Sequence, residues 1–160
     1  MPEYITPKGY AALLKEYERL LKDERPKVTA EVSYAASLGD RSENAEYIYG
    51  KKRLRQIDGR LHYLQRRIES LEVVEPANVA GDRVLFGAYV ELEDEDGTTE
   101  VLQVVGKDEI DIANGKVSYL SPIGRAVLGR EADDEVKLRA PGGVRTLYIM
   151  RFWYEEASPT

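Results

Sequence analysis

Two patterns of hydrophobic positions divide the chain. Residues 6–74 carry apolar side chains at helical spacing, whereas residues 79–154 carry short apolar runs bounded by turn residues. The clearest helical pattern has spacings of three and four in alternation, at Leu54, Ile57, Leu61, Leu64, Ile68 and Leu71. Tyr47 and Gly50 continue it in register. Such a heptad stripe predicts a helix from about Ser42 to Val74 that packs against another helix.

The other helix is predicted between residues 6 and 36. Thr6 followed by Pro7 is a helix-start signal, with Thr as the N-cap and Pro at the first helical position. Pro26 should kink or restart this helix, and Gly39 suits the turn at residues 37–40. The two helices would form an antiparallel coiled-coil hairpin about 45 Å long. The same stripe is also compatible with a dimerisation seam.

The rest of the chain reads as a small sheet domain. Pro76 marks the boundary, so we expect a hairpin domain at residues 1–75 and a second domain at 76–160. Strands are expected at 83–92, 98–105, around Ile110 and Ile112, and at 116–120, 136–139 and 145–154. Ser121 and Pro122 begin a short helix that ends near Leu128. The fold class is therefore α+β, with an antiparallel sheet.

Composition excludes several kinds of site. The 160 residues contain no Cys and one His, which excludes a disulfide scaffold, a thiolate zinc site and a Cys nucleophile, and makes a His-rich metal site untenable. The sequence has no run of about 18 apolar residues, and charged residues are spread through positions 1–25, unlike a signal peptide. We expect a cytoplasmic protein with no membrane contact.

Charge is unevenly distributed along the chain. The net charge is −6, yet the segment from Lys51 to Arg67 has seven cations and one anion, Asp58. A solvated helix face is the simplest explanation. An acidic protein with one basic stripe also suggests a local anionic partner rather than general coating of nucleic acid.

The predicted hairpin turn carries candidate chemistry. Asp40 and Glu43 have the spacing of a capping box, which alone would explain them. That spacing also places two carboxylates about 5–6 Å apart, and Mg²⁺ often takes one or two carboxylates together with phosphate oxygens. A convex tip cannot enclose a metal or a substrate. These acids could therefore act chemically only inside another protein's cleft.

Three motifs carry a resemblance to a known family. Two neighbouring segments resemble the Gre family of bacterial transcript-cleavage factors, in its GreB branch. They are the tip Ala35-Ala36-Ser37-Leu38-Gly39-Asp40-Arg41-Ser42-Glu43-Asn44-Ala45-Glu46-Tyr47 and the basic run Lys51-Lys52-Arg53-Leu54-Arg55. Thr6-Pro7-x-Gly9 resembles the family's opening, and residues 121–129 resemble its C-terminal signature. The chain departs from the family pattern at Leu120, where Thr or Asp is common, and at residues 132–136.

The resemblance implies a mechanism and a set of partners. The hairpin would enter the secondary channel of bacterial RNA polymerase, and Asp40 and Glu43 would help bind a Mg²⁺ ion at the polymerase's active centre. The 3′ end of backtracked RNA would be cleaved there, so the chain would be an accessory factor and not itself an enzyme, a monomer with no cofactor of its own. The tip residues Arg41, Ser42 and Asn44 would position the RNA or the polymerase's trigger loop. The basic run would lie beside the RNA and help position it, through Lys51, Lys52, Arg53 and Arg55. A second domain of FKBP-like fold would dock on the channel rim through Ser121 and Pro122.

Two other functions stay open at this stage. A relative that occupies the same channel without promoting cleavage would share the fold, although intact Asp40 and Glu43 argue against it. An FKBP-like domain could instead be a peptidyl-prolyl isomerase, which needs an aromatic-lined pocket. No pattern in residues 75–160 marks such a pocket.

Overall fold

The computed structural model describes residues 3–39, 44–75 and 81–154 of the chain. Two compact units are present. One comprises Tyr10–Leu71, and the other joins Met1–Gly9 to Glu72–Thr160. The first residues of the chain thus group with the sheet-forming part, whereas the boundary at residues 75 and 76 stays a prediction. Each unit is described by itself below.

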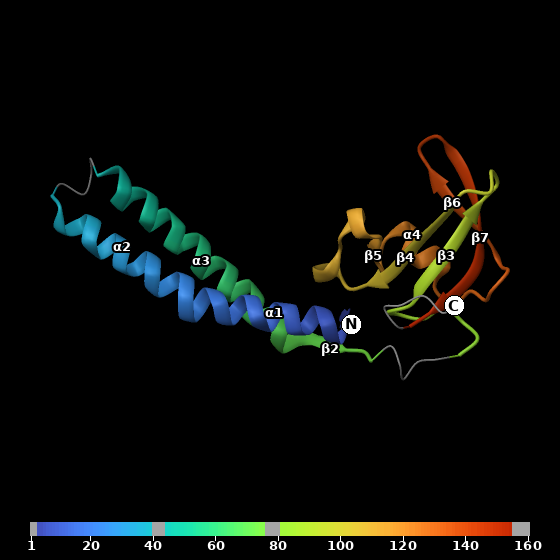
Figure 1. The fold of residues 1–160 in the computed structure, drawn as a ribbon, viewed down its shortest axis with the longest axis horizontal. Helices are drawn as coiled ribbons and strands as arrows, with labels where there is room; N and C mark the ends of the chain where they lie inside the picture. Colours follow the sequence, from blue (N-terminus) through green and yellow to red (C-terminus); the bar gives the residue numbers. More distant parts are fainter. Residues whose placement is uncertain (1–2, 40–43, 76–80, 155–160) are drawn as a thin grey trace. The chain divides into compact units, whose positions relative to one another are not determined.

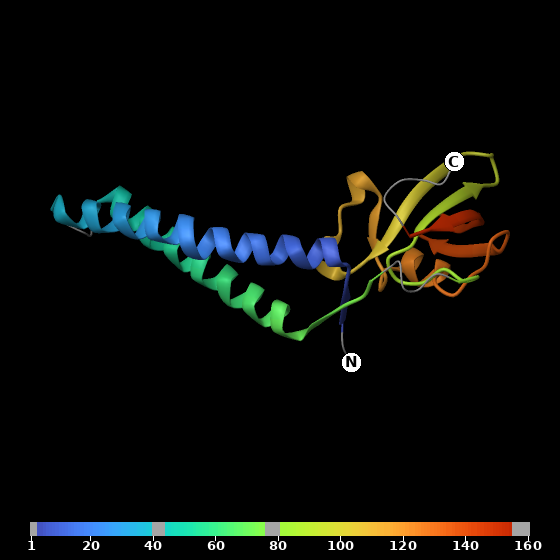
Figure 2. The ribbon, with the colours of Figure 1, turned by 60° about the horizontal axis from the view of Figure 1, so that its bottom comes forward.

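The helical unit is an antiparallel hairpin. Its first arm is a continuous helical path made of α1 (Pro7–Arg19), the π-helical turn η1 (Leu20–Glu24) and α2 (Arg25–Ser37). Its second arm is α3 (Ala45–Ser70). Figures 1 and 2 show α2 and α3 side by side, and their many mutual contacts agree with that view. The apolar heptad stripe of one arm is therefore buried against the other arm of the same chain.

The π-helical turn has an evident cause in the sequence. Pro26 lies in the first turn of α2 and has no backbone N–H, and its ring would clash with the carbonyl four residues earlier in a regular helix. The widened turn just before it relieves this conflict: the backbone N–H of Arg25 donates to the carbonyl of Leu20, five residues back. The helix restarts instead of ending, as the sequence predicts.

The predicted seam forms the core of the hairpin. Ile57, Leu61 and Leu64 of the second arm are buried, and the first arm buries Leu13, Leu20, Val28 and Ala35. Gly50 is also buried, on the face of α3 that meets Val32. The apolar positions beside the seam stay accessible, with Leu14 and Leu21 each more than two-fifths exposed. The buried stripe is thus as narrow as a heptad pattern predicts.

The ends of α3 differ from the prediction. Its N-cap is Asn44, whose Oδ1 accepts the backbone N–H of Tyr47 at 3.1 Å, so the helix begins at Ala45 and not near Ser42. The capping-box interpretation of Asp40 and Glu43, in which Asp40 would be the N-cap, is therefore wrong for this helix. The C-terminal end lies at Ser70 because β2 (Leu71–Val73) is extended and pairs with β1 (Glu3–Ile5). A bond from Val74 N to Ile5 O at 2.9 Å continues this pairing.

The start of α1 is tied to the sheet-forming unit by one carboxylate. Thr6 caps the helix, since its Oγ1 accepts the N–H of Gly9 at 3.1 Å. Glu109 accepts the backbone N–H of Thr6 at 3.0 Å, the Thr6 hydroxyl, and the N–H of Gly106 at 2.9 Å. A Cβ on Gly9 would collide with the Glu109 carboxyl group. Close packing against Glu109 therefore explains why the Thr6-Pro7-x-Gly9 motif has a glycine at its last position.

The second unit contains a mixed sheet with the strand order β5-β4-β3-β7-β6. Its strands are β3 (Tyr89–Asp94), β4 (Thr99–Val105), β5 (Lys116–Ser118), β6 (Glu135–Ala140) and β7 (Gly143–Trp153). Neighbours pair antiparallel except β4 and β5, which are parallel. The α+β fold is thus as expected, with one parallel pair at the edge.

The helix α4 (Pro122–Val127) contributes to the core of this unit. Val127 of α4 packs with apolar residues from the sheet, among them Val90, Leu102, Val136 and Ile149. Ser121 is the N-cap, accepting the N–H of Gly124 at 3.1 Å. The predicted Ser-Pro helix start is confirmed.

One predicted strand, at 83–92, begins only at Tyr89, and another takes a different conformation. Residues 83–88 are not strand, because Gly87 has a φ of +88° and Val84 bonds to Gly129 and Arg130 instead of a neighbouring strand. The region of Ile110 and Ile112 forms the short 3₁₀ turns η3 (Lys107–Glu109) and η4 (Ile112–Asn114). Both isoleucines are exposed there, so their alternation did not reflect a buried sheet face.

Candidate functional site

The turn between the arms of the hairpin is the first candidate. Asp40, Arg41, Ser42 and Glu43 lie outside the described residues, so their predicted roles stay predictions. The residues on either side are described. Gly39 follows α2 with a φ of +139°, and Asn44 donates from its Nδ2 to the carbonyl of Ala35 at 2.6 Å while capping α3. Asn44 thus joins the two arms directly beside the four predicted tip residues.

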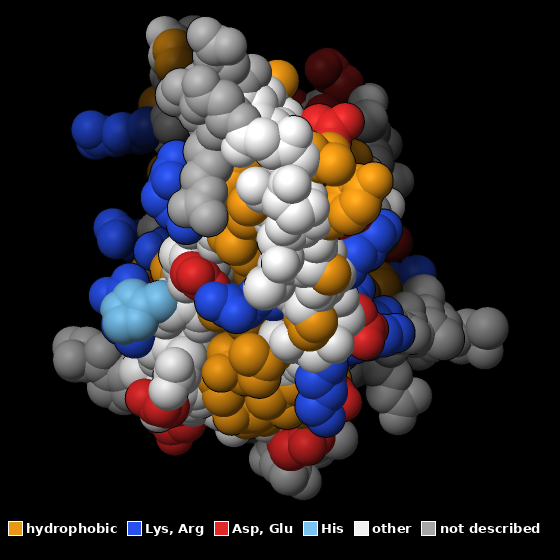
Figure 3. Space-filling view, turned by 90° about the vertical axis from the view of Figure 1, so that its left-hand side faces the viewer, with side chains coloured by type: hydrophobic (Ala, Val, Ile, Leu, Met, Phe, Trp, Pro, Cys, Tyr) orange, Lys and Arg blue, Asp and Glu red, His pale blue; other side chains and the backbone are white. Residues whose placement is uncertain are grey.

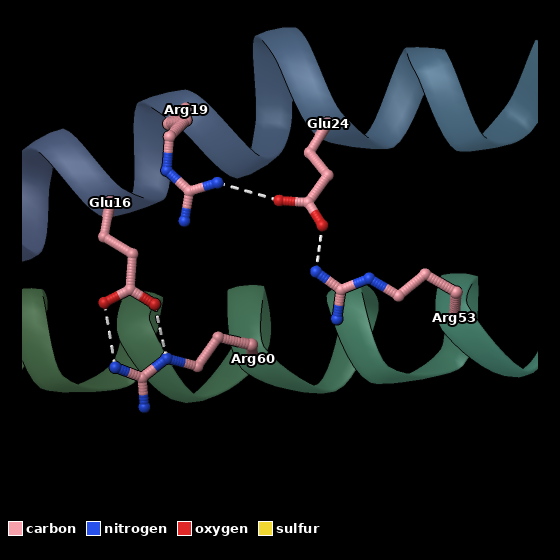
Figure 4. A network of polar contacts seen from close by, with 5 residues as sticks. All are labelled: Glu16, Arg19, Glu24, Arg53 and Arg60. Atoms are coloured by element: carbon pink, nitrogen blue, oxygen red, sulfur yellow. Dashed lines mark hydrogen bonds and ion pairs between the residues drawn. The ribbon is translucent and has the colours of Figure 1, made fainter.

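The arms are also joined by ion pairs along their length. Glu24 lies between two guanidinium groups, accepting from Arg19 at 2.8 Å and from Arg53 of the opposite arm (Figure 4). Glu16 receives a two-pronged pair of bonds from Arg60, at 2.6 and 2.9 Å. Arg25 pairs with Asp58 at 2.7 Å. Each planar guanidinium holds the carboxylate in one geometry, which resists sliding of the arms.

These pairs change the protonation equilibria of the groups involved. The bonds from Arg60 hold the pKa of Glu16 below its usual value of 4.5. The bond to Asp58 raises the pKa of Arg25 further above its already high ordinary value, so the guanidinium stays charged. The Glu16 carboxylate and the Arg25 guanidinium are therefore both charged near neutral pH.

The basic run divides into paired and accessible cations. Arg53 bonds to Glu24 of the opposite arm and so helps hold the two arms of the hairpin together. Lys51, Lys52 and Arg55 are exposed, and within the described parts of the chain they make no ion pair or hydrogen bond. These three side chains can approach an anionic partner without breaking an internal contact.

The predicted docking residues lie at the start of α4. The Ser121 hydroxyl makes its hydrogen bonds within the fold. It accepts the backbone N–H of Gly124 and donates to the carbonyl of Ser118 at 2.6 Å. Pro122 is exposed, and Leu120 beside it is 45% exposed. An accessible Leu-Pro pair on a fixed turn can contact a partner, with Ser121 holding its conformation.

Aromatic residues of the sheet-forming unit pack on one another. Tyr4 from β1 contacts both Phe86 and Tyr119, with ring centroids 5.8 and 5.7 Å apart, and the latter two meet edge-on at 5.4 Å. Tyr89 stacks on Trp153 at 5.9 Å. These rings are engaged in packing, and this arrangement gives the isomerase hypothesis no support.

Some polar and aromatic features were not found from the sequence. Glu16 and Glu24 were not singled out in the sequence, although each makes cross-arm bonds. Tyr34 and Tyr49 are 67% and 71% exposed, and their positions off the heptad seam could have indicated this. Within the described residues, no group of three or more His, Cys, Asp or Glu side chains is arranged to hold a metal ion.

Comparisons with known proteins account for this architecture. A family profile described as "Transcription elongation factor, N-terminal" matches residues 3–73, and one described as "Transcription elongation factor, GreA/GreB, C-term" matches residues 78–154. The chain belongs to the GreA/GreB family of transcription elongation factors. The profiles cover the hairpin and the mixed sheet in turn, so the resemblance noted in the three sequence motifs is confirmed.

Relatives of this GreA/GreB-family chain match it over almost its whole length. Transcription elongation factor GreB of Haemophilus influenzae is 51% identical over 153 residues, covering 96% of this chain and 97% of the relative. GreB of Pseudomonas aeruginosa is 49% identical, with 96% and 91% covered. Such identities show the family and its GreB branch.

Solved structures with similar folds are more distant in sequence. GreA factor homolog 1 of Thermus thermophilus is 24% identical with a TM-score of 0.44, covering 96% of this chain and 99% of that one. A GreA/GreB factor of Nitrosomonas europaea is 22% identical with a TM-score of 0.43, covering 95% and 99%. No helix in the described ranges is both long and apolar enough to cross a membrane.

Proposed function

We propose that this chain stimulates cleavage of backtracked RNA by bacterial RNA polymerase. Its membership in the GreA/GreB family carries the proposal. The hairpin would enter the polymerase's secondary channel, and the chain would act as an accessory factor whose partner performs the catalysis. The geometry supports this because the two arms are joined at Asn44, at Glu24 and at Glu16, which holds them together as one narrow hairpin.

The tip acids would supply ligands for a metal that belongs to the complex. Asp40 and Glu43 are the carboxylates concerned, and oxygen donors of this kind suit Mg²⁺, which commonly keeps waters and binds one or two carboxylates. When bound, Mg²⁺ would lower the pKa of a coordinated water and stabilise charge on the phosphodiester. The part of this chain is to bring two carboxylates to the polymerase's active centre.

The exposed cations would contact the displaced RNA. Lys51, Lys52 and Arg55 follow the tip along α3 and are accessible. A strand of RNA that passes beside α3 would meet them, and each phosphate contact would displace a condensed counterion. We do not assign this role to Arg53 because its guanidinium is bonded to Glu24.

The surface beside α4 would dock on the rim of the channel. Leu120 and Pro122 present accessible apolar groups, with Ser121 fixing the turn between them. Replacing Leu120 by Lys should weaken binding to polymerase without altering cleavage at saturating factor. A matched change at Leu85, 40% exposed elsewhere in this unit, serves as the control.

The decisive experiment uses a purified elongation complex stalled in a backtracked position. Adding the wild-type chain with Mg²⁺ should shorten the transcript from its 3′ end. The double variant Asp40→Asn, Glu43→Gln should bind polymerase with similar affinity yet cleave at least about 100-fold more slowly, a barrier increase of about 3 kcal/mol. Equal cleavage rates for the two proteins would refute the proposal, as would cleavage by the factor without polymerase.

A further inference from the structure

A groove runs between α2 and α3 near the turn of the hairpin. It encloses about 900 Å³ and lies wholly within the helical unit. Gly50 and Val28, both buried, lie among its lining residues. Its lining residues come from both arms, between Arg19 and Tyr34 on the first and between Ala45 and Arg53 on the second.

The two halves of this groove differ in charge. The half farther from the turn holds the bonded group of Arg19, Glu24 and Arg53, together with Asp23 and Lys27. Because the arms are antiparallel, the half nearer the turn is lined by later residues of α2 and earlier residues of α3. Those residues are Glu31, Tyr34, Ala45, Glu46 and Tyr49. None of the described residues that line the turn-proximal half is Lys or Arg.

The groups in the turn-proximal half are free to bind. Glu31 and Glu46 are exposed, and among the described residues neither has an ion-pair or hydrogen-bond partner. Tyr34 and Tyr49 come from opposite arms and expose most of their surface, an unusual state for large aromatic side chains that contribute nothing to the seam. Figure 3 looks onto this end of the hairpin and shows apolar and charged side chains together at its surface.

These features select one class of partner. Two carboxylates repel phosphates, which disfavours RNA. A Lys or Arg side chain would be attracted to both carboxylates and could lie over a tyrosine ring, an arrangement worth about 0.5–2 kcal/mol. Exposed tyrosines are typical anchors in protein interfaces. The accessible cations Lys51, Lys52 and Arg55 do not line the groove, so they do not neutralise the carboxylates of its turn-proximal half from within it.

We propose that the turn-proximal half of this groove binds a Lys- or Arg-bearing polypeptide segment of the protein into which the hairpin inserts. This inference rests on the proposed function, which makes that protein the RNA polymerase, and it adds a second contact surface to the tip acids and the basic run. One side of the hairpin would then face RNA, through the accessible cations, and another would face protein, through Glu31, Glu46 and the two tyrosines.

Cross-linking identifies the occupant directly. A photoreactive benzoylphenylalanine at position 34 or 49 is irradiated in a complex with purified polymerase carrying radiolabelled RNA, and the cross-linked product is mapped by mass spectrometry. Attachment to a polymerase peptide containing Lys or Arg is the expected result. Attachment to the RNA, attachment only to acidic or uncharged peptides, or absence of any cross-link while the complex is intact would each overturn the inference.

Charge variants test the same surface by affinity. The double variant Glu31→Lys, Glu46→Lys should raise the factor concentration needed for half-maximal cleavage by on the order of tenfold at low salt, whereas the Gln double variant should show a smaller rise. The matched control is Glu69→Lys, an exposed acid of α3 outside the groove. At saturating concentrations, the wild type and the three variants should all stimulate cleavage at the same rate.

The outcomes separate this inference from the proposed function. Wild-type protein that binds polymerase but never stimulates cleavage refutes the proposed function, and the cross-linking result still decides the groove. Wild-type protein that stimulates cleavage, together with an unchanged half-saturating concentration for both groove variants, refutes the groove alone. A reduced rate at saturation would likewise contradict it, because the groove is proposed to bind and not to position reacting atoms.

Discussion

Gly50 of α3 lies so close to Val32 of α2 that a Cβ at position 50 would fall 2.5 Å from the Val32 Cγ2. The backbone of α3 is regular there, so the glycine is needed for close approach and not for a special backbone conformation. Because Val is stiff about χ1, its methyl group cannot easily turn aside. The two arms of the hairpin therefore touch through a glycine contact near the candidate tip.

Replacing this glycine should cost stability although alanine is the better helix former. Gly50→Ala gains about 0.8–1.0 kcal/mol of helix propensity but forces the arms apart, at about 1–3 kcal/mol for overpacking. We expect a net loss of about 1 kcal/mol in the free energy of unfolding by urea. The double variant Val32→Ala, Gly50→Ala should recover much of it, and additive effects would contradict the contact.

Two neighbouring cations of the basic run should behave differently. Arg53→Gln removes the cross-arm bond to Glu24, whose carboxylate is only 22% exposed, and should lower stability by about 0.5–1 kcal/mol. Lys52→Gln removes an exposed cation and should leave the urea midpoint unchanged. Equal effects on the midpoint would show that the Glu24 bond contributes nothing.

The same cations should also differ in their effect on RNA. Neutralising Lys51, Lys52 and Arg55 together should weaken engagement of long backtracked RNA strongly at low salt and weakly at high salt, since counterion release supplies the affinity. The half-saturating factor concentration in cleavage assays across a salt series measures this. An effect independent of salt would count against direct contact with phosphates.

The Glu16–Arg60 pair makes hairpin stability depend on pH. The pKa of Glu16 is lowered in the folded protein, so the pair stabilises fully above the unfolded value of 4.5, and this contribution is lost as the pH falls through the folded pKa. Both side chains are partly exposed, so the contribution is about 0.5–1 kcal/mol. Glu16→Gln should therefore destabilise at pH 7 and have little effect near pH 3, measured by thermal melts at both values.

Glu109 should be important for the sheet-forming unit. Its carboxylate accepts three bonds, from Thr6 N, Thr6 Oγ1 and Gly106 N. Glu109→Gln keeps the shape but leaves one acceptor oxygen and adds an amide N–H facing these donors. We expect a loss of about 1.5–3 kcal/mol in unfolding free energy. Asp108→Asn, a change of the same kind at the adjacent position, should cost less than Glu109→Gln.

Local signals in the sequence determined much of this protein. The heptad spacing from Leu54 to Leu71 specified a helix that buries one narrow face against another helix, and Thr6-Pro7 and Ser121-Pro122 specified helix starts because capping depends on adjacent residues. The tip and basic-run motifs carried the family resemblance. The candidate site was predictable only as a set of residues in sequence, not as a set of contacts.

Tertiary structure decided what depends on residues distant in the chain. The end of α3 at Ser70 required pairing of residues 71–73 with residues 3–5, and the exposure of Ile110 and Ile112 depended on which strands meet at the edge of the sheet. Among the residues that the structure describes, Arg53 but not Lys52 pairs with a carboxylate, and the register of the two arms set this difference. The groove with Tyr34 and Tyr49 exists for the same reason, since helical periodicity fixes the face of each arm but not which faces meet.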